Sequence, residues 1–188
     1  IGTLRILEAV RLLGLTNKTK IYQASTSELY GLVQAVPQSE TTPFYPRSPY
    51  AVAKTSAYWL TSNYRKSYGI YTCSGILSNH ESVLRNERFV TMKIINSAKR
   101  IYEGVQNKLE LGNISIVRDW GCAEEYVKAM HLIINNDTPD DFVVSTMETH
   151  SVRDMCEFLC NYLEIDMSCI EQDIKYLRPE ELPYLKGD

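Results

Sequence analysis

The chain has 188 residues, of which 44% are hydrophobic and 23% charged, and its formal net charge is -3. This composition is ordinary for a globular domain, and the small negative charge excludes the basic surface that binding to nucleic acid or an anionic membrane requires. No apolar run in the sequence reaches the roughly 18 residues that a membrane-spanning helix needs.

The chain opens directly with a predicted helix. Apolar residues from Leu4 to Leu13 follow helical spacing, and Gly14 ends the pattern. No start methionine and no leading strand precede this helix, so we expect the chain to be part of a longer polypeptide. Residues 20–25 (KIYQAS) then predict a short strand, and the motif STSELYG predicts a loop at the carboxyl end of that strand.

The strongest predicted helix comes next. Ser48 is a favourable N-cap, Pro49 suits the first turn, and helix-forming residues continue to Gly69. Residues 70–77 (IYTCSGIL) form a mixed apolar run, which predicts a buried strand of a parallel sheet.

The second half of the chain continues the alternation of strands and helices. In chain order it predicts a polar loop over 78–88, a helix over 89–104, a strand over 108–112, a helix over 122–136, a strand over 141–146, a helix over 151–163 and one more short strand over 174–177. Ser151 and Asp154 offer a capping pair for the last helix, and Glu124 and Lys128 form a charge pair at helical spacing. This alternation indicates an α/β fold with a parallel sheet.

The five cysteines are scattered along the chain and odd in number. Two of them lie four residues apart on a predicted helix, but no histidine or second cysteine pair supports a metal site there. We therefore predict no metal centre and interpret Cys156 and Cys160 as buried free thiols. Free thiols fit a reducing cytosol and a cytoplasmic location. The other three cysteines are Cys73, Cys122 and Cys169.

Tyr50 and Lys54 form the most informative local pattern. They lie four residues apart on the predicted helix, so their side chains share one face. A nearby ammonium favours phenolate and is expected to lower the tyrosine pKa from its ordinary value of about 10. A phenol tuned in this way can take a proton from a sugar hydroxyl while hydride leaves the same carbon. By itself the spacing also fits an ordinary pair on a helix surface.

The loop after the first strand supplies the context for this pair. Thr26, Ser27 and Glu28 directly follow the strand, where open parallel sheets bind their ligands. A hydroxyl there could hold the reacting oxygen of a substrate, and a carboxylate could act as a second acid or base. Two separate proton-handling groups, Tyr50 and Glu28, suggest more than a simple alcohol oxidation. The alternative for Glu28 is a loop carboxylate or a helix cap.

Several longer motifs identify a resemblance. In chain order they are YQASTSELYG, TPFYPRSPYAVAK, NHES, LGN followed by RDWG, and LRPEE. Together they resemble the GDP-mannose 4,6-dehydratases, which belong to the extended short-chain dehydrogenase/reductase group, and the similarity runs over essentially the whole chain. The resemblance implies part of a Rossmann-like doubly wound parallel sheet and a smaller C-terminal substrate-binding α/β region.

The resemblance also implies a division of the chain. Residues 1–77 correspond to the C-terminal part of the Rossmann-like domain with the catalytic residues, and residues 78–188 mainly to the sugar-nucleotide-binding region, interleaved with Rossmann strands over about 109–146. Extended members begin with a Gly-rich strand–turn–helix that binds the cofactor pyrophosphate, whereas none of the nine glycines here forms GxGxxG. We expect roughly 100 residues of cofactor-binding fold to lie outside this chain, and the chain alone to bind NADP weakly or not at all.

The resemblance implies a hydro-lyase that converts GDP-mannose to GDP-4-keto-6-deoxymannose, on the route to GDP-fucose, with NADP as cofactor. In that mechanism Tyr50 removes the hydroxyl proton at sugar carbon 4, and Glu28 removes the proton at carbon 5. Thr26 orients the carbon-4 oxygen, and Lys54 binds the nicotinamide ribose while lowering the tyrosine pKa. These four residues are the predicted catalytic group.

Further contacts follow from the same resemblance. His80 and Arg85 are expected to contact the cofactor, together with Lys54. The residues expected to bind the nucleotide diphosphate and its ribose are Asn79, Lys93, Arg118, Arg178 and Glu181. Guanidinium groups suit phosphates, and a carboxylate accepts hydrogen bonds from ribose hydroxyls.

The sequence departs from the family pattern at three places. Leu84, Met92 and Cys122 stand where the family has two arginines and a histidine. The loop that contains Leu84 reaches a neighbouring subunit in the family, so these changes weaken the expectation of a homodimer or homotetramer. Two alternatives stay open: a nucleotide-sugar 4-epimerase, which would not need Glu28 as a carbon-5 base, and a non-catalytic remnant that binds nucleotide sugars.

Overall fold

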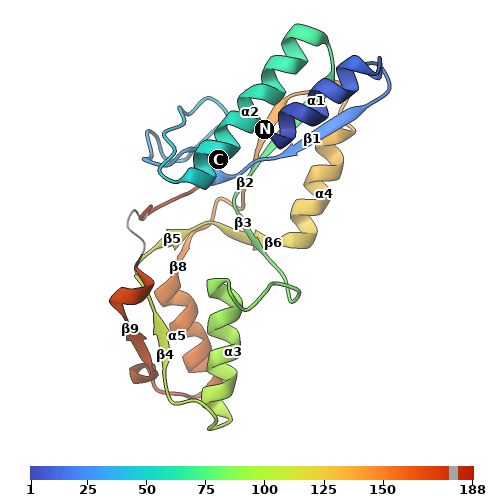
Figure 1. The fold of residues 1–188 in the computed structure, drawn as a ribbon. Helices are drawn as coiled ribbons and strands as arrows, with labels where there is room; N and C mark the ends of the chain where they lie inside the picture. Colours follow the sequence, from blue (N-terminus) through green and yellow to red (C-terminus); the bar gives the residue numbers. More distant parts are fainter. Residues whose placement is uncertain (178–181) are drawn as a thin grey trace.

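A three-stranded parallel sheet organises one unit of the molecule, shown at the top of Figure 1. The computed structural model describes residues 1–177 and 182–188. The strands lie in the order β1 (Lys20–Ala24), β2 (Tyr71–Leu77) and β7 (Asp141–Val144). In the register, Ala24 pairs with Gly75 and Ser74 pairs with Asp141. The predicted α/β class with a parallel sheet is therefore confirmed.

Helices cover both faces of this sheet. They are α1 (Gly2–Leu12) and α2 (Pro49–Tyr68), which pack against each other, and α4 (Ala123–Ile134). The Thr72 hydroxyl donates to the Thr61 carbonyl of α2 at 2.9 Å. The neighbouring residue, Tyr71, donates to the Asn136 carbonyl just beyond α4 at 2.6 Å. Because successive strand residues face opposite sides, α2 and α4 lie on opposite faces of β2.

The long helix α2 begins and ends where the sequence predicts. The Ser48 hydroxyl accepts a hydrogen bond from the Ala51 amide at 3.0 Å, and Pro49 occupies the first helical position. Gly69 ends the helix with a φ of 65°, a left-handed conformation that glycine adopts without strain. The predicted N-cap and C-terminal glycine are both confirmed.

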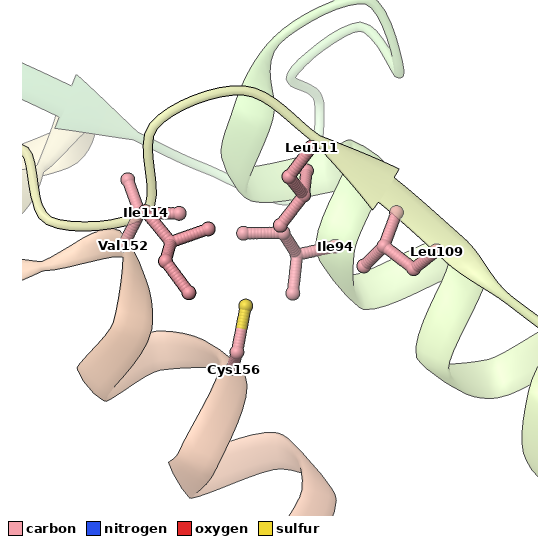
Figure 2. Packing of buried hydrophobic residues seen from close by; sticks show 6 residues of the cluster. All are labelled: Ile94, Leu109, Leu111, Ile114, Val152 and Cys156. Atoms are coloured by element: carbon pink, nitrogen blue, oxygen red, sulfur yellow. The ribbon is translucent and has the colours of Figure 1, made fainter. Parts of the chain in front are cut away.

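A second unit lies at the bottom of Figure 1. It contains α3 (Val90–Tyr102), α5 (Val152–Leu163) and the parallel pair β4 (Leu109–Leu111) and β9 (Ile170–Gln172). Figure 2 shows its core, in which side chains from both helices and β4 meet: Ile94, Leu109, Leu111, Ile114, Val152 and Cys156. Ser151 and Asp154 form the predicted capping box of α5.

Short strand pairs join the two units. They are β3 (Asn79–Glu81) with β6 (Trp120–Cys122), and β5 (Val117–Arg118) with β8 (His150–Ser151). Asp119 lies between β5 and β6 and is only 2% exposed. Its carboxylate accepts hydrogen bonds from the Thr146 amide at 2.9 Å, the Thr146 hydroxyl at 2.8 Å and the Met147 amide at 3.0 Å. This carboxylate therefore holds the loop after β7 against the strands that lead to the second unit.

Several short elements differ from the sequence-based expectations. The segment 78–88 was predicted as a loop, but it contains β3, and no pattern predicted β5, β6 or β8. Strands of two or three residues are too short for a period-two pattern to show. The expected strand over 174–177 is instead a 3-10 turn, η3 (Ile174–Tyr176), because the Asp173 side chain caps it by accepting from the Lys175 amide. The neighbouring strand is β9.

The five cysteines are free thiols. Cys156 and Cys160 are buried, as predicted, and Cys73 is buried in β2. Cys122 is exposed at the start of α4, and Cys169 is half-buried in the 3-10 turn η2 (Met167–Cys169). Within the described ranges no three histidine, cysteine or carboxylate side chains gather as metal ligands would. No described helix has the length and apolar character needed to span a bilayer.

Asp119→Ala is expected to lower the free energy of unfolding by about 3 kcal/mol, because two amides and a hydroxyl lose a charged acceptor that is itself buried. Urea denaturation followed by circular dichroism measures this change. Asp166→Ala serves as the control, since Asp166 caps only the exposed turn η2. A loss of stability at Asp119 no larger than at Asp166 would contradict the assigned role.

Candidate active site

The carboxyl ends of β1 and β2 bring the predicted site residues to one edge of the sheet. Thr26 lies two residues beyond the last residue of β1, and Asn79 and His80 follow β2. Because the two strands are parallel and directly paired, both chain segments leave the sheet at the same edge. Open parallel sheets bind their ligands at this edge.

A single 3-10 turn, η1 (Ser27–Leu29), sets the position of Glu28. The Thr26 side chain caps the turn by accepting a hydrogen bond from the Glu28 amide at 3.3 Å. Leu29 and Tyr30 are 0% and 1% exposed, so the far end of the turn is anchored in the core. The half-buried Thr26 and Glu28 therefore occupy a rigid turn at the sheet edge.

Glu28 lies beside the first turn of α2. The Ser48 hydroxyl lies 3.5 Å from Glu28 Oε2 and donates to it. Tyr50, the second residue of α2, is close enough that the Glu28 charge raises its pKa. The carboxylate and the phenol therefore lie near enough for their charges to interact, at the N-terminal end of α2.

The Tyr50 phenol differs from the sequence-based expectation. Its pKa lies above the ordinary tyrosine value, mainly because partial burial disfavours the charged form, with the Glu28 charge acting in the same direction. A hydrogen-bonding interaction with the Thr26 side chain acts in the opposite direction and lowers it. The prediction that Lys54 lowers the pKa of Tyr50 is thus wrong for the free protein.

The environment of Lys54 explains this difference. Its ammonium donates a hydrogen bond to the Ala24 carbonyl, at the end of β1, at 2.9 Å. It lies 5.7 Å from the centroid of the Tyr50 ring. The Lys54 ammonium is therefore hydrogen-bonded to a backbone carbonyl, whereas the helical spacing predicted the Tyr50 phenol as its partner. Lys54 nevertheless lies at the sheet edge together with Thr26, Glu28 and Tyr50.

The two predicted cofactor contacts beyond α2 lie on and after β3. His80 Nδ1 is 2.9 Å from the Ser78 carbonyl, and its ring stacks on Tyr126 of α4 with centroids 4.7 Å apart. Arg85 has its Nε 3.2 Å from a Glu81 carboxylate oxygen, and its guanidinium lies over the Phe89 ring. His80 is thus fixed at the sheet edge, whereas Arg85 packs within its own loop.

The predicted nucleotide contacts are more dispersed. Lys93, on α3, donates to the Glu110 carbonyl at 2.6 Å and lies 3.9 Å above the Tyr176 ring, and partial burial lowers its pKa. Arg118 donates to the Val117 carbonyl at 2.8 Å. Asn79 is half-buried on β3. Both contacts of Lys93 therefore lie within the second unit, of which its helix α3 is a part. Two further predicted contacts, Arg178 and Glu181, lie outside the described residues.

Sequence reasoning missed two features of this edge. Ser25 is 5% exposed, and its hydroxyl has no hydrogen-bond partner among the described residues, although it directly precedes Thr26. Ser48 was recognised only as a helix cap, and its contact with Glu28 was not foreseen. A surface hollow of about 740 Å³ lies on the neighbouring face of α2 and is lined in part by Val52 and Ser56. It does not include Tyr50.

Comparisons with known proteins agree with one another. The family model described as GDP-mannose 4,6 dehydratase matches residues 1–188. The chain is 56% identical over 174 residues to a GDP-mannose 4,6-dehydratase of Vibrio cholerae, covering 93% of the chain and 47% of that protein. It is 47% identical over 208 residues to the GDP-mannose 4,6 dehydratase of Homo sapiens, covering 100% of the chain and 55% of that protein. The chain thus spans about half the length of these curated relatives.

A solved structure shows the same fold. The structure of RMD from Pseudomonas aeruginosa complexed with NADPH superposes with a TM-score of 0.86 at 25% sequence identity. The match covers 100% of this chain and 62% of that one. The predicted Rossmann-like architecture is confirmed by this similarity.

In the free protein we expect the Tyr50 phenol to titrate above the ordinary tyrosine value of about 10, because burial and the Glu28 charge both favour the neutral form. Thr26→Val should raise this pKa further, since it removes the interaction that lowers it. Carbon-13 NMR of the tyrosine Cζ atoms measures both values, with Tyr50→Phe assigning the resonance. Titration of Tyr50 below the value of free tyrosine would show that Lys54 dominates after all.

Proposed function

Because the chain belongs to the GDP-mannose 4,6-dehydratase family, we propose that it provides the catalytic and sugar-nucleotide-binding part of an enzyme that converts GDP-mannose to GDP-4-keto-6-deoxymannose and water. The observation that supports this most directly is the placement of Glu28 beside Tyr50. A simple alcohol oxidation needs one proton acceptor, whereas dehydration needs a second group at the next carbon atom.

The proposal includes a nicotinamide cofactor, NADP. The residues present fit its nicotinamide-ribose end: the Lys54 ammonium lies at the carboxyl end of β1, and the buried Ser25 hydroxyl there has no partner among the described residues. We propose that Lys54, His80 and Arg85 bind it, and the similar solved structure is complexed with NADPH. When bound, the cofactor accepts hydride from carbon 4 and returns it to carbon 6.

In the proposed reaction Tyr50 takes the proton of the carbon-4 hydroxyl. The Thr26 hydroxyl, which interacts with the Tyr50 phenol, holds the carbon-4 oxygen beside it. Since the pKa of Tyr50 is raised in the free protein, the phenol needs a nearby cation to act as a base near neutral pH. Lys54 is the ammonium on the same helix that can supply this charge.

Glu28 carries out the elimination. The ketone formed at carbon 4 acidifies the proton on carbon 5, and the Glu28 carboxylate accepts that proton. The carbon-6 hydroxyl then leaves as water after Glu28 returns the proton to it, so Glu28 ends the step ionised. The return of hydride to carbon 6 leaves an enolate, which takes a proton from solvent at carbon 5, and Tyr50 releases its own proton to solvent to complete the cycle. Its position on the η1 turn, fixed by the Thr26 cap and the buried Leu29, keeps the carboxylate in place for both transfers.

The nucleotide portion of the substrate is assigned to the second half of the chain. We propose that residues 1–77 form the catalytic portion and residues 78–188 mainly the sugar-nucleotide-binding region, with Rossmann strands interleaved over about 109–146. The residues proposed to bind the nucleotide are Asn79, Lys93, Arg118, Arg178 and Glu181. We also propose that the full protein forms a homo-oligomer in the cytoplasm. The free thiols support that location.

Product identity tests the proposed function. Incubation of the full encoded polypeptide with GDP-mannose and NADP is expected to give a 4-keto-6-deoxy sugar nucleotide, identified by mass spectrometry as the loss of one water. A C4-epimeric hexose of unchanged mass would establish an epimerase instead. Calorimetric binding of GDP-mannose without turnover would establish a non-catalytic binding protein.

Tyr50→Phe and Glu28→Gln are each expected to lower kcat by about 100-fold or more, since each removes a proton-transfer group. The Kd for GDP-mannose should change little, because neither side chain is assigned to the nucleotide. Steady-state kinetics and calorimetry separate the two effects. Glu125→Gln, at an exposed position on α4, is the matched control and should retain full activity. Wild-type turnover in either active-site variant would remove that residue from the mechanism.

A further inference from the structure

We propose that Ser48 is a positioning residue for Glu28: its hydroxyl fixes the carboxylate for proton transfer at the same time as it caps α2. This inference rests on the proposed function of Glu28 as the acid and base at carbons 5 and 6. The observation that supports it is that the Ser48 hydroxyl contacts both the first turn of α2, the helix that carries Tyr50, and the Glu28 carboxylate on the η1 turn.

The hydrogen bonds of Ser48 determine the direction of its proton. Its oxygen accepts from the Ala51 amide at 3.0 Å, and it lies 3.5 Å from Glu28 Oε2. A serine hydroxyl has one proton, and the Ala51 amide is itself a donor, so that proton is available for an acceptor. Among the described residues, the acceptor within reach is the Glu28 carboxylate.

The backbone around Ser48 is rigid. Ser48 is extended, with φ -140° and ψ 155°, and Pro49 follows it directly at the first helical position. Proline restricts both its own φ and the conformation of the residue before it. The hydroxyl is therefore fixed relative to the helix that carries Tyr50.

Glu28 is held at both ends by this arrangement. The Thr26 side chain accepts from its backbone amide at 3.3 Å, and Ser48 donates to its carboxylate. One of these contacts belongs to the strand edge and the other to the helix. Together they set the separation between the carboxylate and the phenol, which has to match the spacing of neighbouring carbon atoms on one sugar ring.

The contact from Ser48 is directed at Oε2 of Glu28, the group proposed to accept the carbon-5 proton. Without this contact the carboxylate could turn about its own side-chain bonds, away from the position that the proton transfer requires. Loss of the Ser48 hydroxyl should therefore lower kcat more than it raises KM.

Three substitutions separate positioning from capping. Ser48→Thr keeps both the cap and the donor, and Ser48→Ala loses both. Ser48→Asp keeps a cap of similar strength but cannot donate, and it places a second negative charge beside Glu28. The measurements are kcat and KM for conversion of GDP-mannose by the full encoded polypeptide, together with the thermal unfolding temperature.

We expect Ser48→Thr to stay within about threefold of the wild-type kcat, and Ser48→Asp and Ser48→Ala to lose about tenfold or more with KM within about twofold. The matched control is Ser151→Ala, which removes an equivalent helix cap from α5. This control should lower the unfolding temperature and leave kcat and KM unchanged.

Ser48→Asp with the kcat of the wild type would overturn the proposal and leave Ser48 as a helix cap only. If the wild-type protein gives no 4-keto-6-deoxy product, the proposed function fails on its own, and the contact is tested by the carbon-13 resonance of the Glu28 carboxyl group. A shift of that resonance in Ser48→Ala, with none in Ser48→Thr or Ser151→Ala, supports the contact. An unmoved resonance refutes it.

Discussion

The parallel pairing of β1 with β2 is the constraint on which the rest of the site depends. It brings the chain after Ala24 and the chain after Leu77 to one edge, although more than 50 residues separate them. Close packing maintains this pairing, because the Tyr22 hydroxyl lies where a side chain on Gly75 would stand, 2.0 Å from an added Cβ. A side chain at position 75 would therefore displace the Tyr22 ring from its place against β2.

Helix α2 adds the second half of the site, and a buried ion pair fixes it to the sheet. Arg65 binds the Asp141 carboxylate of β7 at 2.6 Å and the Thr72 carbonyl of β2 at 2.9 Å, with both charged side chains largely buried. The interaction therefore ties the C-terminal part of the helix to two strands. Its N-terminal part contacts the η1 turn through Ser48 and Glu28. Tyr50 is positioned between these two attachments.

The long elements could be predicted from the sequence because their signals are local. Ser48, Pro49 and Gly69 bound α2 by capping rules that involve only neighbouring residues. The partner of Lys54 could not be predicted in this way, since the Ala24 carbonyl lies 30 residues earlier in the chain. Helical spacing places an ammonium near a phenol, but only the packed sheet shows which acceptor binds it. For the same reason, the contact between Ser48 and Glu28 could not be predicted from the sequence, since the two residues are 20 positions apart.

The proximity of Glu28 and Tyr50 couples their charges in a way that suits the proposed reaction. A carboxylate beside the phenol makes the phenolate a stronger base, which favours removal of the carbon-4 proton but leaves less phenolate near neutral pH. Once Tyr50 has taken that proton it is neutral, and the two groups no longer repel each other. Glu28 then faces the carbon-5 proton as the one remaining anion of the pair. The order of the two proton transfers is set by the substrate, because the carbon-5 proton becomes acidic only after the ketone forms at carbon 4, and the electrostatics of the pair are compatible with that order.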